Sequence, residues 1–533
     1  MIQHTKFEYN IMKKSIIAMA VLFSCTYTIA QTEFDALKYV QTDINGTARY
    51  TGMAGAFGAL GGDASAIKDN PAGLGIYRRS ELTGTFNTLM QSSTSSWNKG
   101  SSIDDLYKVG FNNFSYVIAL PTRNAENGNK GLLSSNFSIS FNRLKNFDKS
   151  MYVKGSSQTS SMTDYLADLT NGISESNLQS TSTNNPFNDI KVPWISILAY
   201  EGYLINPAAG INQWSSLLNP GETVTPSYKL FEKGYLDEYS FGWAGNFDNE
   251  LFLGATLNLK SLNYSAFSNY SETFNGTGNN DGGSMSLKDT VITKGSGINL
   301  KLGAIYCPTD YLRLGISVHT PSVLILTDNY YTKLDFNTTK DGYITTPGDG
   351  YSNYQIQSPF QFNASAAFIA GEKGLISVEY DFANYNGMRL RSDIGDAQSF
   401  DLENNAIRTN INNVNTIKIG GEYKLTKNFA IRAGYANSGA STLLNAAKEI
   451  RPNTLRTDLE YFRNNKTDYF TAGLGYREAG WYIDCAFMNK RLDETFYPYN
   501  SNTISAKNPT LAVVPASIIT TNNNLVVTLG FKF

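Results

Sequence analysis

The last nine residues of the chain, Leu525 to Phe533, constrain its fold more than any other stretch. They read L-V-V-T-L-G-F-K-F, so apolar side chains fall at every second position. Alternation with a period of two is typical of a strand with one apolar and one more polar face. At the end of a soluble protein such a strand would invite aggregation, whereas a closed barrel in a membrane turns its apolar face to lipid. The segment therefore predicts a transmembrane β-barrel that is closed by its last strand.

The same alternation recurs along the chain and predicts fourteen strands. Leu312, Leu314, Ile316 and Val318 give one of the clearest examples, with polar or small residues between them. An even number of strands is what a single-chain bacterial outer-membrane barrel requires. The predicted strands are residues 82–88, 114–120, 136–142, 239–247, 251–259, 298–306, 312–318, 360–368, 375–382, 417–425, 429–435, 470–476, 481–487 and 525–533.

Connections between these strands alternate between short and long. Five are tight and a sixth, residues 121–135, is a longer link of the same kind, while the other seven run from about 25 to about 96 residues. All short turns then lie at one end of the barrel and all long loops at the other, as in bacterial outer-membrane barrels. The predicted fold class is therefore all-β, a 14-stranded antiparallel transmembrane β-barrel.

Composition agrees with this fold and excludes other classes. The chain of 533 residues is 13% aromatic but only 17% charged, which suits aromatic girdles at the two membrane surfaces. Past residue 30 there is no apolar run of about 18 residues, the length a membrane helix needs. A formal net charge of −2 without a basic block argues against nucleic-acid binding. Beyond residue 30 the two cysteines, Cys307 and Cys485, are too few and too far apart for a zinc site, and we expect no metal and no cofactor.

The amino terminus resembles a secretory signal. Lys13 and Lys14 precede an apolar run from Ile16 to Phe23, and small residues at 28–30 offer a cleavage site. We therefore expect a signal peptide over residues 1–30, an N-terminal plug over 31–79 and the barrel with long extracellular loops over 80–533.

Residues 31–79 do not alternate and are unlike barrel wall. Gly52 to Gly62 is built from small residues, with glycines at 52, 55, 58 and 61. This spacing differs from the G-x-G-x-x-G of a nucleotide-binding loop, and no apolar strand precedes it. Close packing in a confined space, such as the lumen of a barrel, is the interpretation we favour.

One long loop, residues 143–238, carries apolar clusters in an otherwise polar setting. Tyr165, Leu166 and Leu169 form one cluster, and Trp194, Ile195 and Leu198 belong to a second. They either pack the loop on itself or embed it in the outer leaflet, or they form a greasy patch that captures an apolar ligand at the mouth. Both interpretations stay open at this point.

Three regions of the chain resemble the long-chain fatty-acid transporter family, which includes the toluene and xylene uptake proteins. The first is G-x-A-G-A-F-x-A-L-G-G-D-A-S-A at 52–66 with Asn70-Pro71-Ala72-Gly73-Leu74 just after it. The others are the hairpin that begins at Ile298 and the strand pairs at 417–435 and 470–487. They occur in family order at both ends of the chain, whereas the loops show no such resemblance.

The resemblance implies a fourteen-stranded barrel with an N-terminal helical plug, the hatch, in its lumen. It implies passive uptake of a hydrophobic small molecule, such as a long-chain fatty acid, across the bacterial outer membrane, with release through a gap in the wall. The gating residues implied are Asp63, Asn70, Pro71, Ala72 and Gly73. The ligand-binding residues expected are Phe57, Leu60, Tyr165, Leu166, Leu169, Trp194, Ile195 and Leu198.

The expected partners are a hydrophobic ligand and the lipid and lipopolysaccharide around the barrel, and the chain is expected to be a monomer. An enzyme is not expected, because only His319 remains beyond the signal segment and no G-x-S-x-G elbow is present. A hemin receptor that uses His319 as a ligand is one alternative. A shuttle protein of type IX secretion, which would resemble the same family, is the other. The sequence does not indicate which strand carries the opening.

Overall fold

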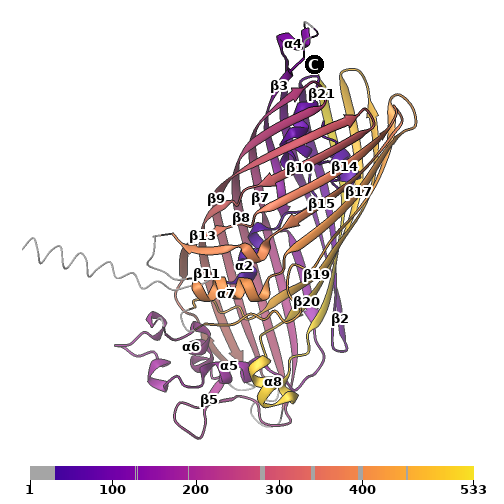
Figure 1. Ribbon diagram of the computed structural model, residues 1–533. Helices are drawn as coiled ribbons and strands as arrows, with labels where there is room; N and C mark the ends of the chain where they lie inside the picture. The colour runs from indigo at the N-terminus through magenta and orange to yellow at the C-terminus, as the bar shows by residue number, and fades with distance from the viewer. Residues whose placement is uncertain are drawn as a thin grey trace, which may run out of the picture.

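The computed structural model describes residues 31–533 except 127, 129, 190, 277–281, 338–341, 394–399 and 452–453. Figure 1 shows a tall barrel of inclined strands with helices inside it and at its lower end. The expected signal peptide, residues 1–30, lies outside the described residues. No described helix is both long enough and apolar enough to cross a membrane.

Fourteen antiparallel strands form the closed wall, and each corresponds to one predicted strand. Each pairs with the wall strand before it and the one after it, and β21 pairs with β1 along nearly its whole length. The prediction of a 14-stranded barrel is therefore confirmed. The wall strands are β1 (Glu81–Trp97), β2 (Gly100–Pro121), β3 (Leu132–Asn146), β7 (Thr223–Phe247), β8 (Leu251–Asn275), β9 (Ser284–Thr309), β10 (Leu312–His319), β14 (Gln361–Ala370), β15 (Gly374–Ala383), β17 (Val414–Lys424), β18 (Phe429–Ser438), β19 (Tyr461–Arg477), β20 (Trp481–Tyr497) and β21 (Ala516–Lys532).

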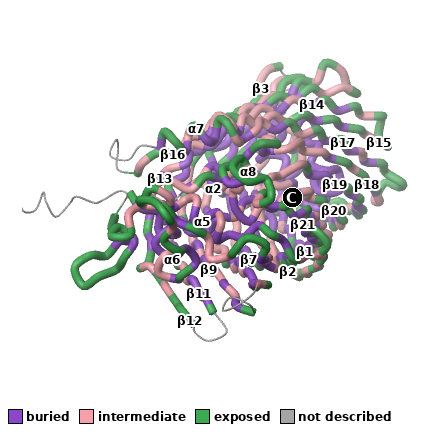
Figure 2. Tube along the Cα trace, turned by 90° about the horizontal axis from the view of Figure 1, so that it is seen from below, coloured by how far each residue is buried: buried purple, intermediate pink, exposed green. Residues whose placement is uncertain are grey.

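Outward side chains form an apolar band around the wall. On β8, Leu253, Leu257 and Leu259 are 38%, 46% and 44% exposed, whereas Phe252 and Asn258, which point inward, are 2% and 0% exposed. Nine residues at about 3.3 Å each, on a strand tilted by about 40°, give a band roughly 20–25 Å tall, the height of a lipid-facing belt. Figure 2 shows that buried chain fills the middle of the ring.

The short turns lie at one end of the barrel, as predicted, but the other end differs from the expectation. Residues 89–113, predicted to be a long loop, instead continue β1 and β2 to a tight turn at Asn98 and Lys99. The outward residues of this part of β1 are Ser92, Thr94 and Ser96, because the hairpin rises beyond the apolar band. The alternation disappears in this part of β1, whereas β2 still turns Ile103, Tyr107 and Val109 outward, at 66%, 71% and 79% exposed.

The N-terminal segment lies inside the barrel. It comprises α2 (Glu33–Val40), α3 (Ala48–Gly52), and the 3-10 turns η1 (Ala66–Lys68) and η2 (Pro71–Ile76). Thr32 caps α2 through a capping box with Asp35. Most side chains from 31 to 77 are buried against the inner faces of the strands. We refer to residues 31–79 as the hatch segment.

Several wall strands are continued by further strands beyond short breaks. Pro321 separates β10 from β11 (Val323–Asn337), and Pro359 separates β13 (Gly350–Gln357) from β14. Proline lacks the N–H that the ladder requires, so each break falls where it is expected. The other continuations are β4 (Lys149–Lys154), which follows β3, β12 (Gly342–Thr345), which pairs with β11, and β16 (Arg389–Ser392), which follows β15 through η6 (Tyr385–Gly387).

Helices and short strands close the end opposite the tight turns. We refer to residues 157–222, which fold over this end, as the outer cap. Its elements are α5 (Met162–Thr170), η3 (Glu175–Asn177), η4 (Pro186–Asn188), α6 (Trp194–Glu201), β5 (Ile205–Pro207) and β6 (Trp214–Ser216). Near it lie α7 (Asp401–Asn410), α8 (Asn502–Lys507) and η8 (Pro509–Leu511), while α4 (Arg123–Glu126) is at the opposite end (Figure 1).

Candidate functional site

Inward glycines of the wall form a socket for the hatch segment. A Cβ atom on Gly303 would lie 1.9 Å from Oδ1 of Asn70, and one on Gly254 would lie 2.5 Å from the carbonyl of Pro71. No larger residue fits at either position without displacing the hatch. Gly315, Gly420, Gly434 and Gly473 likewise face hatch backbone.

Wall side chains satisfy the irregular backbone of the hatch. Arg313 donates to the carbonyl of Leu60 at 2.9 Å, and Lys301 donates to that of Lys68 at 2.9 Å. Ser317 donates to the carbonyl of Asp69 at 2.6 Å. Non-helical backbone enclosed in a barrel needs such partners, because an unpaired buried peptide group is costly. The polar lumen is therefore shaped to this segment.

Asn70 is the most heavily used of the predicted gating residues. Its amide donates to the carbonyls of Gly58 at 2.7 Å and Ala304 at 3.2 Å, and its Oδ1 accepts from the N–H of Ala72 at 3.1 Å. Pro71 occupies the first position of η2, where a missing N–H costs nothing. One side chain thus joins a hatch turn, the wall and the start of η2.

The other predicted gating residues, Asp63, Ala72 and Gly73, lie in the same fold of the hatch. Both oxygens of Asp63 accept from Thr47 Oγ1, at 2.8 and 2.9 Å. Gly73 packs against Gly61, and its carbonyl accepts from the N–H of Gly62 at 3.1 Å. The structure brings the five residues together in the hatch, and their role in gating stays a prediction.

A chain of ion pairs fastens the hatch to the wall. Glu422 lies 2.8 Å from Arg49 of α3 and 2.6 Å from Arg432, which in turn lies 2.6 Å from Asp484. The side chains of Arg432 and Asp484 are fully buried. Removal of one member would leave an uncompensated buried charge, which typically costs several kcal/mol.

Asp69 anchors a second polar cluster at the turn between η1 and η2. Burial would raise the pKa of its carboxyl, but the ammonium groups of Lys68 and Lys418 outweigh this and lower the pKa to about 2. Tyr50 donates to it at 2.5 Å. His319 points inward, with Nε2 against the carbonyl of Asp69 and Nδ1 against Gln361, at 2.8 and 3.2 Å. Asp69 is therefore ionised wherever the hatch is seated at neutral pH.

A cavity of about 380 Å³ lies beside α2 in the middle of the lumen. Three aromatic rings on its wall touch one another. Tyr39 of α2 lies 5.3 Å from Tyr264 and 6.4 Å from Phe147, and the last two rings are 5.1 Å apart. These rings give part of the cavity an apolar surface.

Charged side chains line the rest of the cavity, and most of them form ion pairs, although Asp148, Asp289 and Glu460 form none with any residue in the described ranges. Lys38 lies 2.6 Å from Glu232, and Lys490 lies 2.5 Å from Asp43. Lys145 is different, because it donates to the carbonyl of Lys38 at 3.0 Å but, within the described ranges, has no carboxylate within ion-pairing distance. The cavity thus combines aromatic rings with one ammonium group that a bound anion could neutralise.

The barrel wall steps inward next to this ammonium group. β2 pairs with β3 only over Asn113–Pro121, and residues 100–112 pair with β1 alone in the part of the chain that is described. β4 instead lies on the inner side of the β1–β2 hairpin, where Ser102 donates to the carbonyl of Tyr152 at 2.6 Å. The residues at the step, 145–149, also line the cavity. One edge of β2 is therefore open beside the cavity.

The register of β3 against β7 shifts between Arg143 and Lys145, and a glycine of β7, Gly234, lies opposite the step. The N–H of Phe147 donates to the carbonyl of Gly234 at 3.0 Å, and Gly234 has a φ of +126°. A Cβ there would lie 2.0 Å from the carbonyl oxygen of Asn263, so only glycine fits. The step is thus built by β7 as much as by β3.

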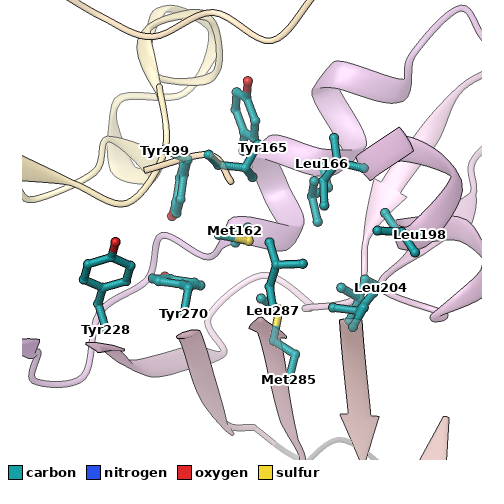
Figure 3. Close-up of a cluster of buried hydrophobic side chains, with 14 of the residues drawn as sticks. Met162, Tyr165, Leu166, Leu198, Leu204, Tyr228, Tyr270, Met285, Leu287 and Tyr499 are labelled. Atoms are coloured by element: carbon teal, nitrogen blue, oxygen red, sulfur yellow. The ribbon is translucent and has the colours of Figure 1, made fainter. Parts of the chain in front are cut away.

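The apolar residues predicted in the outer loop are packed inside the outer cap. Tyr165, Leu166, Trp194, Ile195 and Leu198 are between 0% and 8% exposed, and Leu169 is partly buried against them. Figure 3 shows residues of α5 and α6 facing the ends of the long strands, where Tyr228, Tyr270, Met285 and Leu287 complete the cluster. This arrangement agrees with a loop packed on itself, and ligand binding by these residues stays a prediction.

Phe57 and Leu60, the other predicted ligand residues, are 0% and 3% exposed in the core of the hatch. Phe57 packs against Tyr50, with ring centroids 5.7 Å apart. The two residues lie in the same hatch turn as Asn70's partner Gly58, apart from the outer cluster. Their part in binding also stays a prediction.

Comparison with known proteins supports the fold. No protein-family model and no curated protein matches the sequence. A Pseudomonas aeruginosa FadL homologue gives a TM-score of 0.52 at 13% identity over 92% of this chain and 99% of that one. Two variants of TodX, a monoaromatic hydrocarbon channel, each give 0.50 at 13% identity over 92% of this chain and 99% or 100% of theirs.

These likenesses confirm the predicted resemblance at the level of the fold. The chain has the barrel architecture of the FadL and TodX structures along nearly its whole length. Closed barrels with a lipid-facing apolar band belong in bacterial outer membranes, as predicted for this chain.

Proposed function

We propose that this protein carries hydrophobic small molecules, such as long-chain fatty acids, passively across the outer membrane, and that it releases them sideways between β2 and the β3–β4 step. FadL and TodX structures share its fold, and TodX is described as a toluene transporter of Pseudomonas putida. The observation that carries the proposal is the open edge of β2 beside an aromatic-lined cavity in a lumen that the hatch otherwise fills.

Lateral release follows from the cost of hydrating an apolar chain. A molecule that left through a water-filled pore would lose about 0.8 kcal/mol for each methylene exposed. A molecule that moves from the cavity through the wall gap leaves the aromatic rings of the cavity for the hydrocarbon of the membrane, so its apolar chain stays out of water. The hatch, held by Asn70 and the Arg49–Glu422 pair, keeps the axial path closed to polar solutes.

Lys145 makes an amphiphile with an anionic head a better fit than a pure hydrocarbon. Its ammonium group lies 5.2 Å from the ring of Phe147, so a bound head group and an apolar tail would meet adjacent surfaces. The neighbouring carboxylates are already paired with other cations. The ligand class we favour is therefore a long-chain carboxylic acid.

A reversible cross-link across the gap tests the exit. Asp104 of β2 and Ser150 of β4 face each other, and Ser150 Oγ donates to Asp104 Oδ2 at 2.6 Å. Asp104→Cys with Ser150→Cys, in a background with Cys307 and Cys485 changed to serine, ties the hairpin to the step when oxidised. We expect uptake of a labelled fatty acid by cells to fall on oxidation and to recover with reductant.

The matched control joins strands far from the gap. Thr327 and Asn353 are register partners on β11 and β13, and their side chains are 2.7 Å apart. Thr327→Cys with Asn353→Cys should form a disulfide without an effect on uptake. Equal uptake by the oxidised and reduced gap variant would refute lateral release at this position.

A protein shuttle in type IX secretion remains the alternative function, because it would share the fold. Gene deletion separates the two: blocked secretion of many proteins with normal fatty-acid uptake would favour the shuttle. The hemin alternative has less support, because His319 is engaged on both ring nitrogens. An unchanged hemin spectrum in His319→Ala would eliminate the ligand role.

A further inference from the structure

Lysines of β7, β9 and β11 gather on the outer surface of the sector formed by β7, β8, β9 and β11, just beyond the apolar band. On these strands the band ends at one row of register partners, Tyr239, Leu259, Ile298 and Val323. These four side chains are 42% to 48% exposed. On β11 the apolar face continues for one more outward residue, Ile325, which is 51% exposed. Beyond it the outward residues are mostly polar apart from a few aromatic rings, which marks the passage from hydrocarbon to head groups.

The lysines form two tiers above that row. Lys233 and Lys294 lie six and four residues beyond it, or roughly 13–20 Å along the strands. Lys229, Lys288 and Lys333 lie ten residues beyond it, in a single row with Asn269 between the first two. At about 4.8 Å between neighbouring strands, the upper lysines span only about 15 Å.

Most of this positive charge is not neutralised by the protein. Asp335 pairs with both Lys288 and Lys333, at 2.7 and 2.9 Å. Lys229, Lys233 and Lys294 are exposed and form no ion pair with any residue in the described ranges. The unpaired positive charge of these lysines therefore favours binding of an anion from outside the chain.

Aromatic rings lie between the two tiers. Phe231 and Phe267 are register partners, and Tyr331 lies in the same row two strands farther on. These three side chains are 36%, 39% and 42% exposed. Flat apolar rings flanked by ammonium groups suit a ligand that carries both sugar rings and phosphates.

The feature is confined to one sector of the barrel. At the matching position beyond the band on β1 and β21, outward residues are neutral, as at Ser92, Thr94 and Thr521, and the next strand, β20, adds a single exposed cation in this row, Arg491. A barrel that needed lysines only for solubility would have no reason to place them on neighbouring strands.

From these observations we infer that the lysines bind the phosphorylated head group of an outer-leaflet glycolipid, lipopolysaccharide. Because the patch starts where the band ends, acyl chains can lie against Leu259 and Ile298 while phosphates reach Lys233 and Lys294. Sugars and phosphates farther from the membrane meet the aromatic row and the upper tier. The lipid would thus be held at a defined sector of the wall.

Charge removal at the three unpaired lysines tests this site. The variant Lys229→Gln, Lys233→Gln, Lys294→Gln is compared with Lys373→Gln, Lys424→Gln, Lys427→Gln, which removes three exposed charges at the opposite end. Binding of purified lipopolysaccharide to each full-length barrel in mild detergent is measured by microscale thermophoresis. At roughly fivefold per lysine, we expect affinity to fall about 100-fold in the first variant and to be unchanged in the second.

Two further binding measurements test whether the phosphates of the lipid are the groups that the patch recognises. Heat-modifiable gel migration verifies that each barrel is folded. Dephosphorylated lipopolysaccharide should bind wild type and the patch variant equally weakly. Equal affinity for intact lipopolysaccharide in wild type and the patch variant would overturn the inference. So would phosphatidylglycerol that binds the wild type as tightly as lipopolysaccharide, because the patch would then be a general anionic surface.

Discussion

Replacement of Asn70 by alanine should loosen the hatch without harming the barrel. The side chain is 1% exposed and makes hydrogen bonds to Gly58, Ala72 and Ala304. Alanine leaves the carbonyl of Gly58 and the N–H of Ala72 buried without these partners, at about 1–3 kcal/mol each. A total near 3 kcal/mol shifts the equilibrium between seated and unseated hatch by about 100-fold.

Hydrogen exchange measures this shift directly. In Asn70→Ala, amide protection of residues 57–76 should fall by about 100-fold, while residues 251–259 of the wall keep their protection because the ladder is untouched. Single-channel conductance in planar bilayers should rise in parallel, since the axial path is open more often.

The control is a buried asparagine for which the structure shows no hydrogen bond to the hatch. Asn258 of β8 is 0% exposed, and its amide donates only to the carbonyl and hydroxyl of Thr256 on its own strand. Asn258→Ala should leave hatch protection unchanged. Hatch protection in Asn70→Ala equal to that of wild type would refute the claim that this residue holds the hatch.

Three other perturbations test separate parts of the account. Gly303→Ala places a methyl group 1.9 Å from Asn70 Oδ1, so hatch protection should fall as in Asn70→Ala, whereas Gly421→Ala, with its nearest neighbour at 3.5 Å, should have no effect. Lys145→Met should weaken binding of a long-chain fatty acid about 10- to 100-fold in calorimetry by removing a charge-assisted hydrogen bond, and leave the matching fatty alcohol unaffected; equal losses for both ligands would contradict a head-group role. Asp69, with a pKa lowered from 3.8 to about 2, stabilises the seated hatch fully above pH 4 and loses this contribution as the pH falls toward 2. Conductance should therefore rise as the pH is lowered from 4 toward 2, and a conductance that stays unchanged over this range would contradict the role of Asp69.

The sequence predicts the wall where lipid touches it and fails elsewhere for a physical reason. Inside the band, outward residues must be apolar and inward ones need not be, so alternation identifies all fourteen strands. Beyond the band both faces meet water or the cap. The outer half of β1 therefore carries no period, and its extent is visible only in its pairing. The outer half of β7 alternates in the opposite sense, with Val224, Tyr228 and Leu230 buried inward against the outer cap and mostly polar residues outward.

Some residues of the candidate site can be predicted from the sequence, and others cannot. Asn70 and Pro71 belong to a motif and could be picked out from the sequence. Lys145 and Phe147 could not, because they lie past the end of a predicted strand and gain meaning only when the wall steps inward beside α2. The glycines of the socket could not be told from ordinary wall glycines until the hatch was placed against them.

Apolar clusters in loops show a different limit of prediction from sequence. Tyr165 and Trp194 stand out in a polar loop, but sequence alone does not distinguish a core from an exposed patch. Burial in the outer cap decides what they pack against, since strand residues far along the chain, such as Tyr270 and Leu287, complete the cluster.

Photo-cross-linking with a diazirine-labelled fatty acid tests the central claim most directly. Mass spectrometry of the labelled barrel in outer-membrane vesicles should place adducts on Phe147 and neighbouring residues of the step, and on residues 106–112 along the open edge of β2. Adducts confined to the tight-turn end of the lumen, with none at the step, would contradict a lateral path through the wall.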